Sequence, residues 1–437
     1  CSTFNQSSID KVVYKKKDAE KFQNAYVDWI IMDYQSLNKS ESIWFRNMIS
    51  SANDLIKIPS RDTVCNKIFD LYVTYKLKLK SILKNKKLSI TADSWTSTAN
   101  ENFECVTVHF IDDSPKLQSL LLSLYVNPGS HTAEHLHNSI SETLQEFSID
   151  QNIVVLITDS APNMVALSKY LSYDHHYCIC HILQLTADLA FKDENLNGCN
   201  QIMKRVRGLV GLFSSSPMKE AELLRVQPQL EKLVLIQDVK TRWSSTYAMI
   251  NRLLKLQGPI ITLSNSGVIE KNYELHDDDW RRLKEINILL EPFSISQKIM
   301  EGEQYITISL IPYHICMIRD HLQNIINDVA SNASIVNLAK LMLEKFNTDW
   351  SSGVAGTVLI ENATMGPKKR KKGFPKRVLL AACVDPRTKD LDGIPKEEHG
   401  EIWKLLQTEM VQYFSNDAIS EDIVAETTGN YNDTYLL

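Results

Sequence analysis

Two short apolar segments, Leu88-Ser89-Ile90-Thr91-Ala92-Asp93 and Ile153-Val154-Val155-Leu156-Ile157-Thr158-Asp159, decide the fold of this chain. Each is an apolar run with β-branched residues and is followed by turn-forming residues, a pattern typical of a buried strand. Each run ends in an aspartate, and carboxylates at strand ends lie where ligands bind in open α/β folds. Asp93 and Asp159 could therefore share a divalent cation, which points to phosphoryl transfer on nucleic acid. The alternative is that each aspartate only caps the turn after its strand.

The residues around these two runs predict an α/β core. Residues 102–111 alternate in polarity, residues 117–126 form a third and mostly apolar run, and residues 132–147 have the apolar period of an amphipathic helix. Three strands, a helix and a fourth strand in this order resemble the start of a ribonuclease H-like fold. The catalytic acids of that fold lie at the ends of its first and fourth strands, where this sequence has Asp93 and Asp159.

The rest of the chain is predicted to be mainly helical. We expect an N-terminal helical region over residues 1–85, the first part of the core over 86–195 and a helical insertion over 196–350. A basic mobile loop is expected over 351–376, followed by a return segment over 377–437. The predicted fold class is therefore α/β: a ribonuclease H-like core interrupted by a large all-α insertion, with an N-terminal helical region.

Composition limits the class of protein. The chain has 437 residues, enough for more than one domain, and its net charge of −5 means that nucleic-acid binding would depend on local basic patches. Its eight cysteines are irregularly spaced, which is typical of reduced thiols inside a cell rather than of a secreted disulfide scaffold. No apolar run is long enough to cross a bilayer, so we expect no membrane partner.

The stretch from His175 to His181 is rich in potential metal ligands. Cys178 and His181 are three residues apart and would share one face of a helix that began there. No second Cys/His pair lies within ordinary finger spacing, so structural zinc is not expected. The pair either lines a site beside Asp159 or is a buried cysteine with a hydrogen-bonded histidine, and the residues alone favour the second interpretation.

Two further motifs suit contact with nucleic acid. Arg242 and Trp243 open a predicted helix, and a tryptophan beside an arginine can offer a base-stacking surface and a phosphate partner. The competing interpretation is a core tryptophan with an arginine that holds a nearby carboxylate. The basic run Lys368-Lys369-Arg370-Lys371-Lys372 follows Pro367 and is typical of a nuclear-import signal or a nucleic-acid patch. We therefore expect this chain in the nucleus.

Six blocks, in order along the chain, resemble the hAT superfamily of DNA transposases and, within it, the BED-finger transposase-derived proteins. The blocks are residues 88–97, 106–112, 158–164, 178–181, 241–246 and 381–389. The resemblance implies metal-assisted cleavage and joining of DNA, with Asp93 and Asp159 as catalytic residues that hold Mg²⁺ or Mn²⁺. It also implies that Trp243 stacks on a base near a DNA hairpin end and that Arg242 contacts phosphate. Cys178 and His181 would belong to the surround of the active site.

Two features of the family have no match in this sequence. They are its third acid, a glutamate in a Ser-Glu-Arg context of the C-terminal dimerisation region, and its N-terminal BED finger. We therefore predict a nuclear DNA-binding protein of transposase ancestry without a complete DDE active site in this chain, whose homo-oligomerisation would use regions missing here. Two alternatives stay open: a piece of an active transposase that cleaves and transfers strands with a metal ion, and a protein-interaction scaffold or transcription regulator derived from a transposase.

Overall fold

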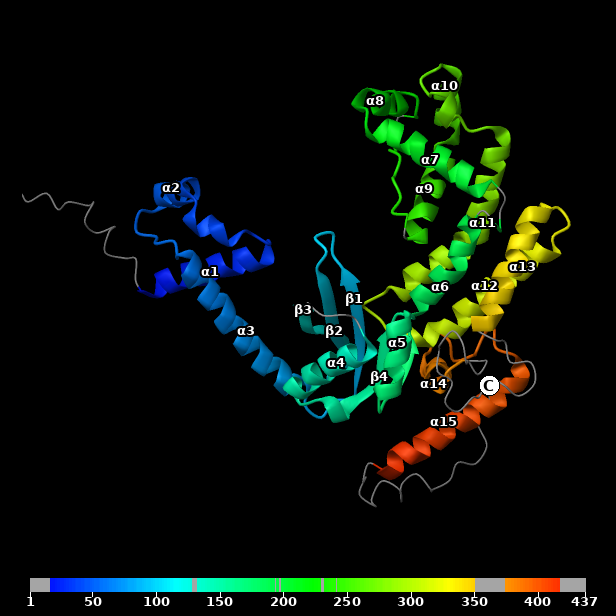
Figure 1. The fold of residues 1–437 in the computed structure, drawn as a ribbon. Helices are drawn as coiled ribbons and strands as arrows, with labels where there is room; N and C mark the ends of the chain where they lie inside the picture. The colour runs from blue at the N-terminus through cyan, green and yellow to red at the C-terminus, as the bar shows by residue number, and fades with distance from the viewer. Residues whose placement is uncertain are drawn as a thin grey trace, which may run out of the picture. The chain divides into compact units, whose positions relative to one another are not determined.

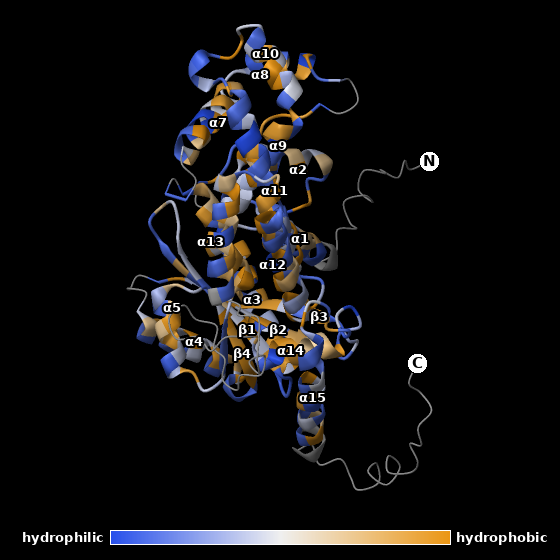
Figure 2. Ribbon diagram, turned by 90° about the vertical axis from the view of Figure 1, so that its right-hand side faces the viewer, coloured by the Kyte–Doolittle hydropathy of each residue, from blue (hydrophilic) through white to orange (hydrophobic). Residues whose placement is uncertain are grey.

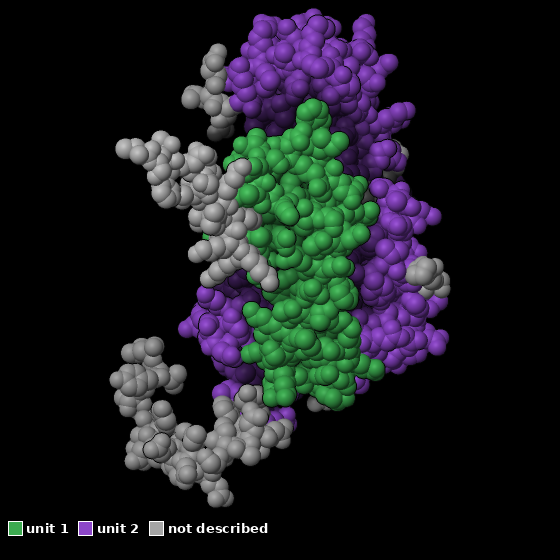
Figure 3. Space-filling model, turned by 90° about the vertical axis from the view of Figure 1, so that its left-hand side faces the viewer, with its two compact units in different colours: residues 1–86, 144–152 green, residues 87–143, 153–437 purple. Residues whose placement is uncertain are grey.

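The computed structural model describes residues 16–127, 132–192, 194–195, 198–228, 232–240, 242–349 and 374–416. The chain divides into two compact units, one made of residues 1–86 with 144–152 and the other of residues 87–143 with 153–437 (Figure 3). The domain boundaries expected from the sequence remain predictions. Within the described residues, no helix is long and apolar enough to span a bilayer.

The first unit is helical, as the sequence predicted. Its elements are α1 (Lys16–Met32), the short 3₁₀ helix η3 (Leu37–Glu41), α2 (Ile43–Ala52), α3 (Arg61–Leu83) and η4 (Asp150–Asn152). A small core of Tyr26, Val27 and Ile30 from α1 and Val64 from α3 holds the helices together. Ser60 caps α3 by accepting a hydrogen bond from the N–H of Thr63 at 3.2 Å, in the way expected of a helix start.

The second unit contains one five-stranded mixed sheet (Figure 1). Its strands are β1 (Leu88–Thr96), β2 (Asn102–Ile111), β3 (Leu117–Val126), β4 (Ile153–Thr158) and β5 (Asp174–Tyr177). Their order in the sheet is β3-β2-β1-β4-β5. The first three strands are antiparallel neighbours, whereas β4 runs parallel to β1, and β5 runs parallel to β4. This arrangement confirms the ribonuclease H-like prediction and adds β5, which the sequence analysis did not identify.

The two faces of the sheet have different surroundings because side chains alternate along each strand. Ile90 of β1 and Val108 of β2 are fully buried on one face, and Glu104 of β2 shares that face. The helix α4 (Ala133–Phe147) packs there, since the Ser139 hydroxyl donates a hydrogen bond of 2.7 Å to the Glu104 carboxylate. The opposite face carries Thr91, Asp93 and their β2 neighbours, and it therefore bears the candidate site.

A large helical region follows β4, as predicted. Its helices are α5 (Pro162–Leu167), α6 (Ile179–Ala187), α7 (Cys199–Ser214), α8 (Pro217–Arg225), α9 (Trp243–Lys255), α10 (Gln257–Asn265), α11 (Asp277–Met300), α12 (Ile311–Asn327), α13 (Ala333–Asp349), α14 (Lys376–Val384) and α15 (Lys396–Asn416). Short 3₁₀ helices lie between them: η5 (Ser168–Tyr170), η6 (Asp188–Phe191), η7 (Lys271–Tyr273) and η8 (Ile308–Leu310). One hydrophobic core runs through this region, and the long helix α11 packs against α6, α9, α12 and α13. Figure 2 shows hydrophobic residues along the strands and interleaved with hydrophilic residues on the helices.

A buried ion pair secures the irregular segment between α8 and α9. The Asp238 side chain is fully buried and accepts hydrogen bonds from Nε and Nη2 of Arg207 on α7, the latter at 2.7 Å. The Thr246 hydroxyl on α9 donates a further hydrogen bond of 2.9 Å to the same carboxylate. Burial raises the pKa of Asp238, but these donors and the Arg207 charge outweigh burial, so the pKa lies below its ordinary value.

Candidate active site

Asp93 and Asp159 lie at the same edge of the sheet. The parallel strands β1 and β4 pair Thr91 with Ile157, and each aspartate follows two residues later. Oδ1 of Asp93 accepts the Ser94 N–H at 2.8 Å, and Oδ1 of Asp159 accepts the Ala161 N–H at 3.1 Å. Asp159 follows the last residue of β4, so one oxygen of its carboxylate holds the turn after that strand. Asp93 was expected at the end of its strand but lies within β1, which continues to Thr96, and one oxygen of its carboxylate is held by the next residue of the strand. In the described part of the chain, the second oxygen, Oδ2, has no hydrogen-bond partner in either case.

The two carboxylates interact electrostatically. Burial raises the pKa of Asp93, the Ser94 N–H lowers it, and the Asp159 carboxylate raises it further. His181 has a smaller effect that lowers this pKa. The net result is a raised pKa, so ionisation of Asp93 is disfavoured. A cation placed between the carboxylates would relieve this unfavourable interaction.

The start of α6 lies beside Asp159. Cys178 is the N-cap residue of α6, and its backbone N–H donates a hydrogen bond of 2.7 Å to the carbonyl oxygen of Thr158. His181 is the third residue of the helix and is close enough to Asp93 to affect its pKa. The structure thus brings Cys178 and His181 to the edge where the two aspartates lie. This arrangement corresponds to the functional interpretation of the pair, in which both residues line a site beside Asp159.

The Cys178 thiol is more acidic than an ordinary cysteine. Its pKa is lowered to about 7, because the Cys180 thiol donates to its sulfur and the backbone N–H groups of His181 and Cys180 add further hydrogen bonds against the effect of burial. The Cys180 thiol shows the opposite shift, since its hydrogen bond to Cys178 and its burial raise its pKa. At neutral pH, a larger fraction of Cys178 than of Cys180 is therefore in the thiolate form.

The donor chemistry of the edge suits a hard divalent cation. Carboxylate oxygens are the ligands that Mg²⁺ and Mn²⁺ prefer, and Mg²⁺ is commonly bound by one or two carboxylates with water and substrate phosphate. Asp93 and Asp159 would supply these oxygens through their unpaired Oδ2 atoms. Among the residues that the structure describes, no group of three or more His, Cys, Asp or Glu side chains is arranged to hold a metal ion.

Arg242 and Trp243 are neighbours in sequence, but their side chains differ in solvent exposure. Arg242 is the exposed N-cap residue of α9. Trp243 is 2% exposed and belongs to the helical core, where it packs edge-on against Phe293 with ring centroids 6.4 Å apart. Its indole Nε1 has no hydrogen-bond partner among the described residues. This geometry matches the competing interpretation of a core tryptophan, except that Arg207 rather than Arg242 holds the nearby carboxylate. Base stacking by Trp243 stays a prediction.

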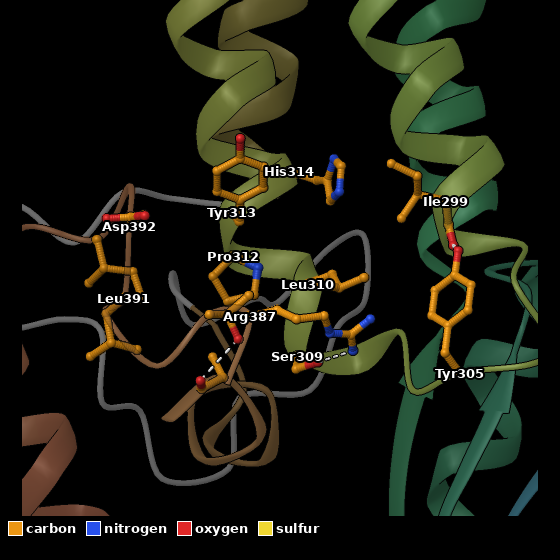
Figure 4. A pocket seen from close by; sticks show the side chains of 13 residues that line it. Ile299, Tyr305, Ser309, Leu310, Pro312, Tyr313, His314, Arg387, Leu391 and Asp392 are labelled. Atoms are coloured by element: carbon orange, nitrogen blue, oxygen red, sulfur yellow. Dashed lines mark hydrogen bonds between the residues drawn. The ribbon is translucent and has the colours of Figure 1, made fainter. Parts of the chain in front are cut away.

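A cavity lies beside the Asp385-Pro386-Arg387 segment, as Figure 4 shows. Its volume is about 360 Å³, and it is lined by residues between Ile299 and His314 and between Ala382 and Ile394. Arg387 donates from Nε and Nη2 to Asp385 and from Nη2 to the carbonyl oxygen of Ile306 at 2.7 Å. These contacts connect the segment after α14 to the loop after α11. The segment thus has a clear structural role in the fold of the helical region.

Comparison with known proteins assigns the family. A model of the RNase-like domain of ZBED1 matches residues 91–178, and a model of the ZBED1 RNase-like helical domain matches residues 176–289. A Zea mays protein named as an AC transposase is 26% identical over 440 residues, which cover 93% of this chain and 51% of that protein. The chain is a hAT-family transposase-like protein.

Other relatives of this hAT-like protein have different names. A Talaromyces stipitatus protein named as the transcriptional regulator tpeD is 28% identical over 54% of this chain and 32% of its own length. Zinc finger BED domain-containing protein RICESLEEPER 2 of Oryza sativa subsp. japonica is 21% identical over 75% of this chain and 47% of its own length. The chain spans about half the length of the AC transposase that it matches.

Proposed function

We propose that this hAT-like protein binds DNA at the carboxyl edge of its sheet, and that Asp93 and Asp159 hold Mg²⁺ or Mn²⁺ there. The observation that carries the proposal is the meeting of two carboxylates from parallel strands at one edge, each with Oδ2 unpaired among the described residues. Two such oxygens and the phosphates of DNA together offer the ligands that these cations prefer.

The residues around the site would each have a defined task. The Ser94 and Ala161 N–H groups fix one oxygen of each aspartate, which leaves the other oxygen oriented for binding. His181 lies close enough to Asp93 to favour its ionised form. When bound, a divalent cation would neutralise charge on a phosphate and polarise its oxygen. Arg242, exposed at the start of α9, remains available for a phosphate contact.

A second candidate function is metal-dependent strand cleavage by this chain. The name of the Zea mays relative, AC transposase, favours it. Against it, no third carboxylate joins Asp93 and Asp159 in a metal-binding group among the described residues. We therefore propose DNA binding as the primary function. We also propose a nuclear location, for which the predicted signal, residues 368–372, lies outside the described residues.

The test is DNA binding across a salt series, with and without Mn²⁺. Wild type, Asp93→Asn and Asp159→Asn would be titrated with labelled duplex and hairpin DNA. The control is Asp70→Asn, because Asp70 is an exposed residue of α3. We expect wild-type binding to weaken with salt, as phosphate contacts require, and to be strengthened by Mn²⁺. That strengthening should be lost in both site variants and kept in the control.

Two outcomes would separate the candidates. Absence of wild-type binding at low salt would refute the proposed function. Shortened labelled DNA that appears with Mn²⁺ in wild type, and disappears in both site variants, would favour cleavage over binding alone.

A further inference from the structure

The cavity beside the Asp385-Pro386-Arg387 segment has the size of a small-ligand site. Its volume is about 360 Å³, and pockets of about 300–1,000 Å³ commonly take small molecules. Its lining comes from the end of α11, the loop after α11, the first turn of α12, the end of α14 and the segment after α14. None of the described residues Asp93, Asp159, Cys178 and His181 lines it. The cavity is therefore separate from the site at the edge of the sheet.

His314 of α12 presents a buried imidazole to this cavity. The residue is 6% exposed, and its Nδ1 lies 3.0 Å from the hydroxyl oxygen of Ser296, which is fully buried on α11. Its Nε2 has no hydrogen-bond partner among the described residues. Burial lowers the pKa of His314, so at pH 7 the ring is neutral and carries one N–H. When the Ser296 hydroxyl donates to Nδ1, this proton is on Nε2, which can then donate to a ligand.

Arg387 brings a second donor to the same cavity. Its Nε and Nη2 donate to the Asp385 carboxylate, and Nη2 also donates to the carbonyl oxygen of Ile306 at 2.7 Å. In the part of the chain that the structure describes, Nη1 has no partner. Asp385 offsets part of the Arg387 charge, so this site favours a ligand with one negative charge over a multiply charged one.

The two donors lie beside an aromatic and apolar wall. The guanidinium carbon of Arg387 lies 5.6 Å from the centroid of the Tyr305 ring. Figure 4 shows the His314 imidazole and the Arg387 guanidinium extending toward the side of the cavity where Tyr305 and Ile299 lie. Asp392, an acidic residue of the lining, lies at the opposite side of that view. The arrangement suits a ligand with an acceptor group at one end and a flat apolar body.

We propose that this cavity binds a small aromatic monocarboxylate, with its carboxylate on Nε2 of His314 and Nη1 of Arg387 and its ring beside Tyr305. Hydrogen bonds to an ionised acceptor are roughly twice as strong as neutral ones, which favours a carboxylate over an uncharged carbonyl group. An aromatic body gains from edge or offset contacts with a tyrosine ring in addition to the apolar area that it buries. This ligand site is independent of DNA binding at the edge of the sheet.

The experiment is isothermal titration calorimetry of the full chain with naphthylacetate. The uncharged amide, naphthylacetamide, has the same aromatic body and tests the need for the carboxylate. His314→Leu removes the imidazole donor, whereas His314→Gln keeps a side-chain N–H. The matched control is His321→Leu, because His321 is a partly buried residue of the same helix and is not part of the cavity lining.

We expect wild type and His321→Leu to bind naphthylacetate with equal affinity and to bind the amide clearly more weakly. His314→Leu should bind naphthylacetate roughly 10- to 150-fold more weakly, the range that corresponds to loss of one hydrogen bond to a charged group. His314→Gln should recover part of that affinity. All three variants should bind the amide about as weakly as wild type does.

Three outcomes would overturn the proposal. They are absence of binding heat for wild type at millimolar naphthylacetate, equal wild-type affinity for the acid and the amide, and wild-type affinity for the acid in folded His314→Leu. Far-ultraviolet circular dichroism shows whether each variant is folded. If His314→Leu is not, Tyr305→Leu is read in its place, since Tyr305 is 36% exposed on the loop after α11. Its affinity for naphthylacetate should fall roughly 2- to 10-fold, as loss of one aromatic pair predicts, and an unchanged affinity would contradict the placement of the ring.

Discussion

Replacement of Trp243 separates a core residue from a DNA-stacking residue. The Trp243 side chain is 2% exposed and is the largest of the fully buried side chains in the part of the chain that the structure describes. It contacts Phe293 edge-on and Tyr247 at a centroid distance of 6.2 Å, and both neighbours belong to the same hydrophobic core. Trp243→Ala would leave a cavity between α9 and α11 that these rings cannot fill without moving.

The expected magnitude follows from this burial. Truncation of a fully buried tryptophan to alanine typically lowers the free energy of unfolding by about 3–5 kcal/mol. Trp243→Phe should lose clearly less, for two reasons. It keeps a ring against Phe293, and it removes an indole N–H that has no partner among the described residues, where an unpaired buried donor costs about 1–3 kcal/mol.

Urea denaturation followed by far-ultraviolet circular dichroism measures these differences without depending on tryptophan fluorescence. The control is Trp44→Ala, since Trp44 is 82% exposed and its truncation should change the unfolding free energy by less than about 0.5 kcal/mol. A wild-type unfolding curve for Trp243→Ala, together with weakened DNA binding, would refute the assignment of Trp243 to the core.

Three further predictions concern titratable side chains. Arg207→Met leaves the Asp238 carboxylate buried without its ion-pair partner, so urea denaturation at pH 7 should show a loss of about 3–5 kcal/mol, and an unchanged curve would count against the pair. The pKa of Asp93 is raised above its ordinary value of 3.8, so the folded state binds more protons than the unfolded state. Stability should therefore fall as pH rises from 3.8 through the folded-state pKa, and Asp93→Asn should remove that fall in a series of melting temperatures. Cys178, with a pKa of about 7, should react with iodoacetamide increasingly through pH 7 while Cys180 reacts slowly; equal rates by peptide mass spectrometry would contradict the hydrogen bonds to the Cys178 sulfur.

The sequence predicts an element correctly where the polarity pattern of its residues matches the burial of that element in the fold. The segment that ends at Asp159 is an unbroken apolar run, and a strand buried on both faces needs that composition. Because β1 and β4 are parallel neighbours, the residues that end the two apolar runs lie at one edge of the sheet, which is why the sequence could predict that the aspartates lie near each other. It did not predict that β1 continues beyond Asp93 to Thr96. The helix α4 could be predicted equally well, since its apolar residues recur with the period of a helix.

The sequence was less informative where tertiary contacts decide the outcome. The strand β5 consists of Asp174-His175-His176-Tyr177, which lacks β-branched residues, and it is held by pairing with β4 and by a hydrogen bond between His175 and Thr158 at 2.9 Å. Whether Trp243 faces solvent or the core depends on the position of α11, which local pattern does not specify.

The most direct test of the central claim is Mn²⁺ binding followed by electron paramagnetic resonance, in which the signal of free Mn²⁺ falls as the ion binds. We expect wild type and Asp70→Asn to bind Mn²⁺ with equal affinity. Asp93→Asn and Asp159→Asn should each lose that binding, because both carboxylates at the edge are required. Unchanged Mn²⁺ binding in either site variant would contradict a site shared by the two aspartates, and so would a wild type that binds no Mn²⁺.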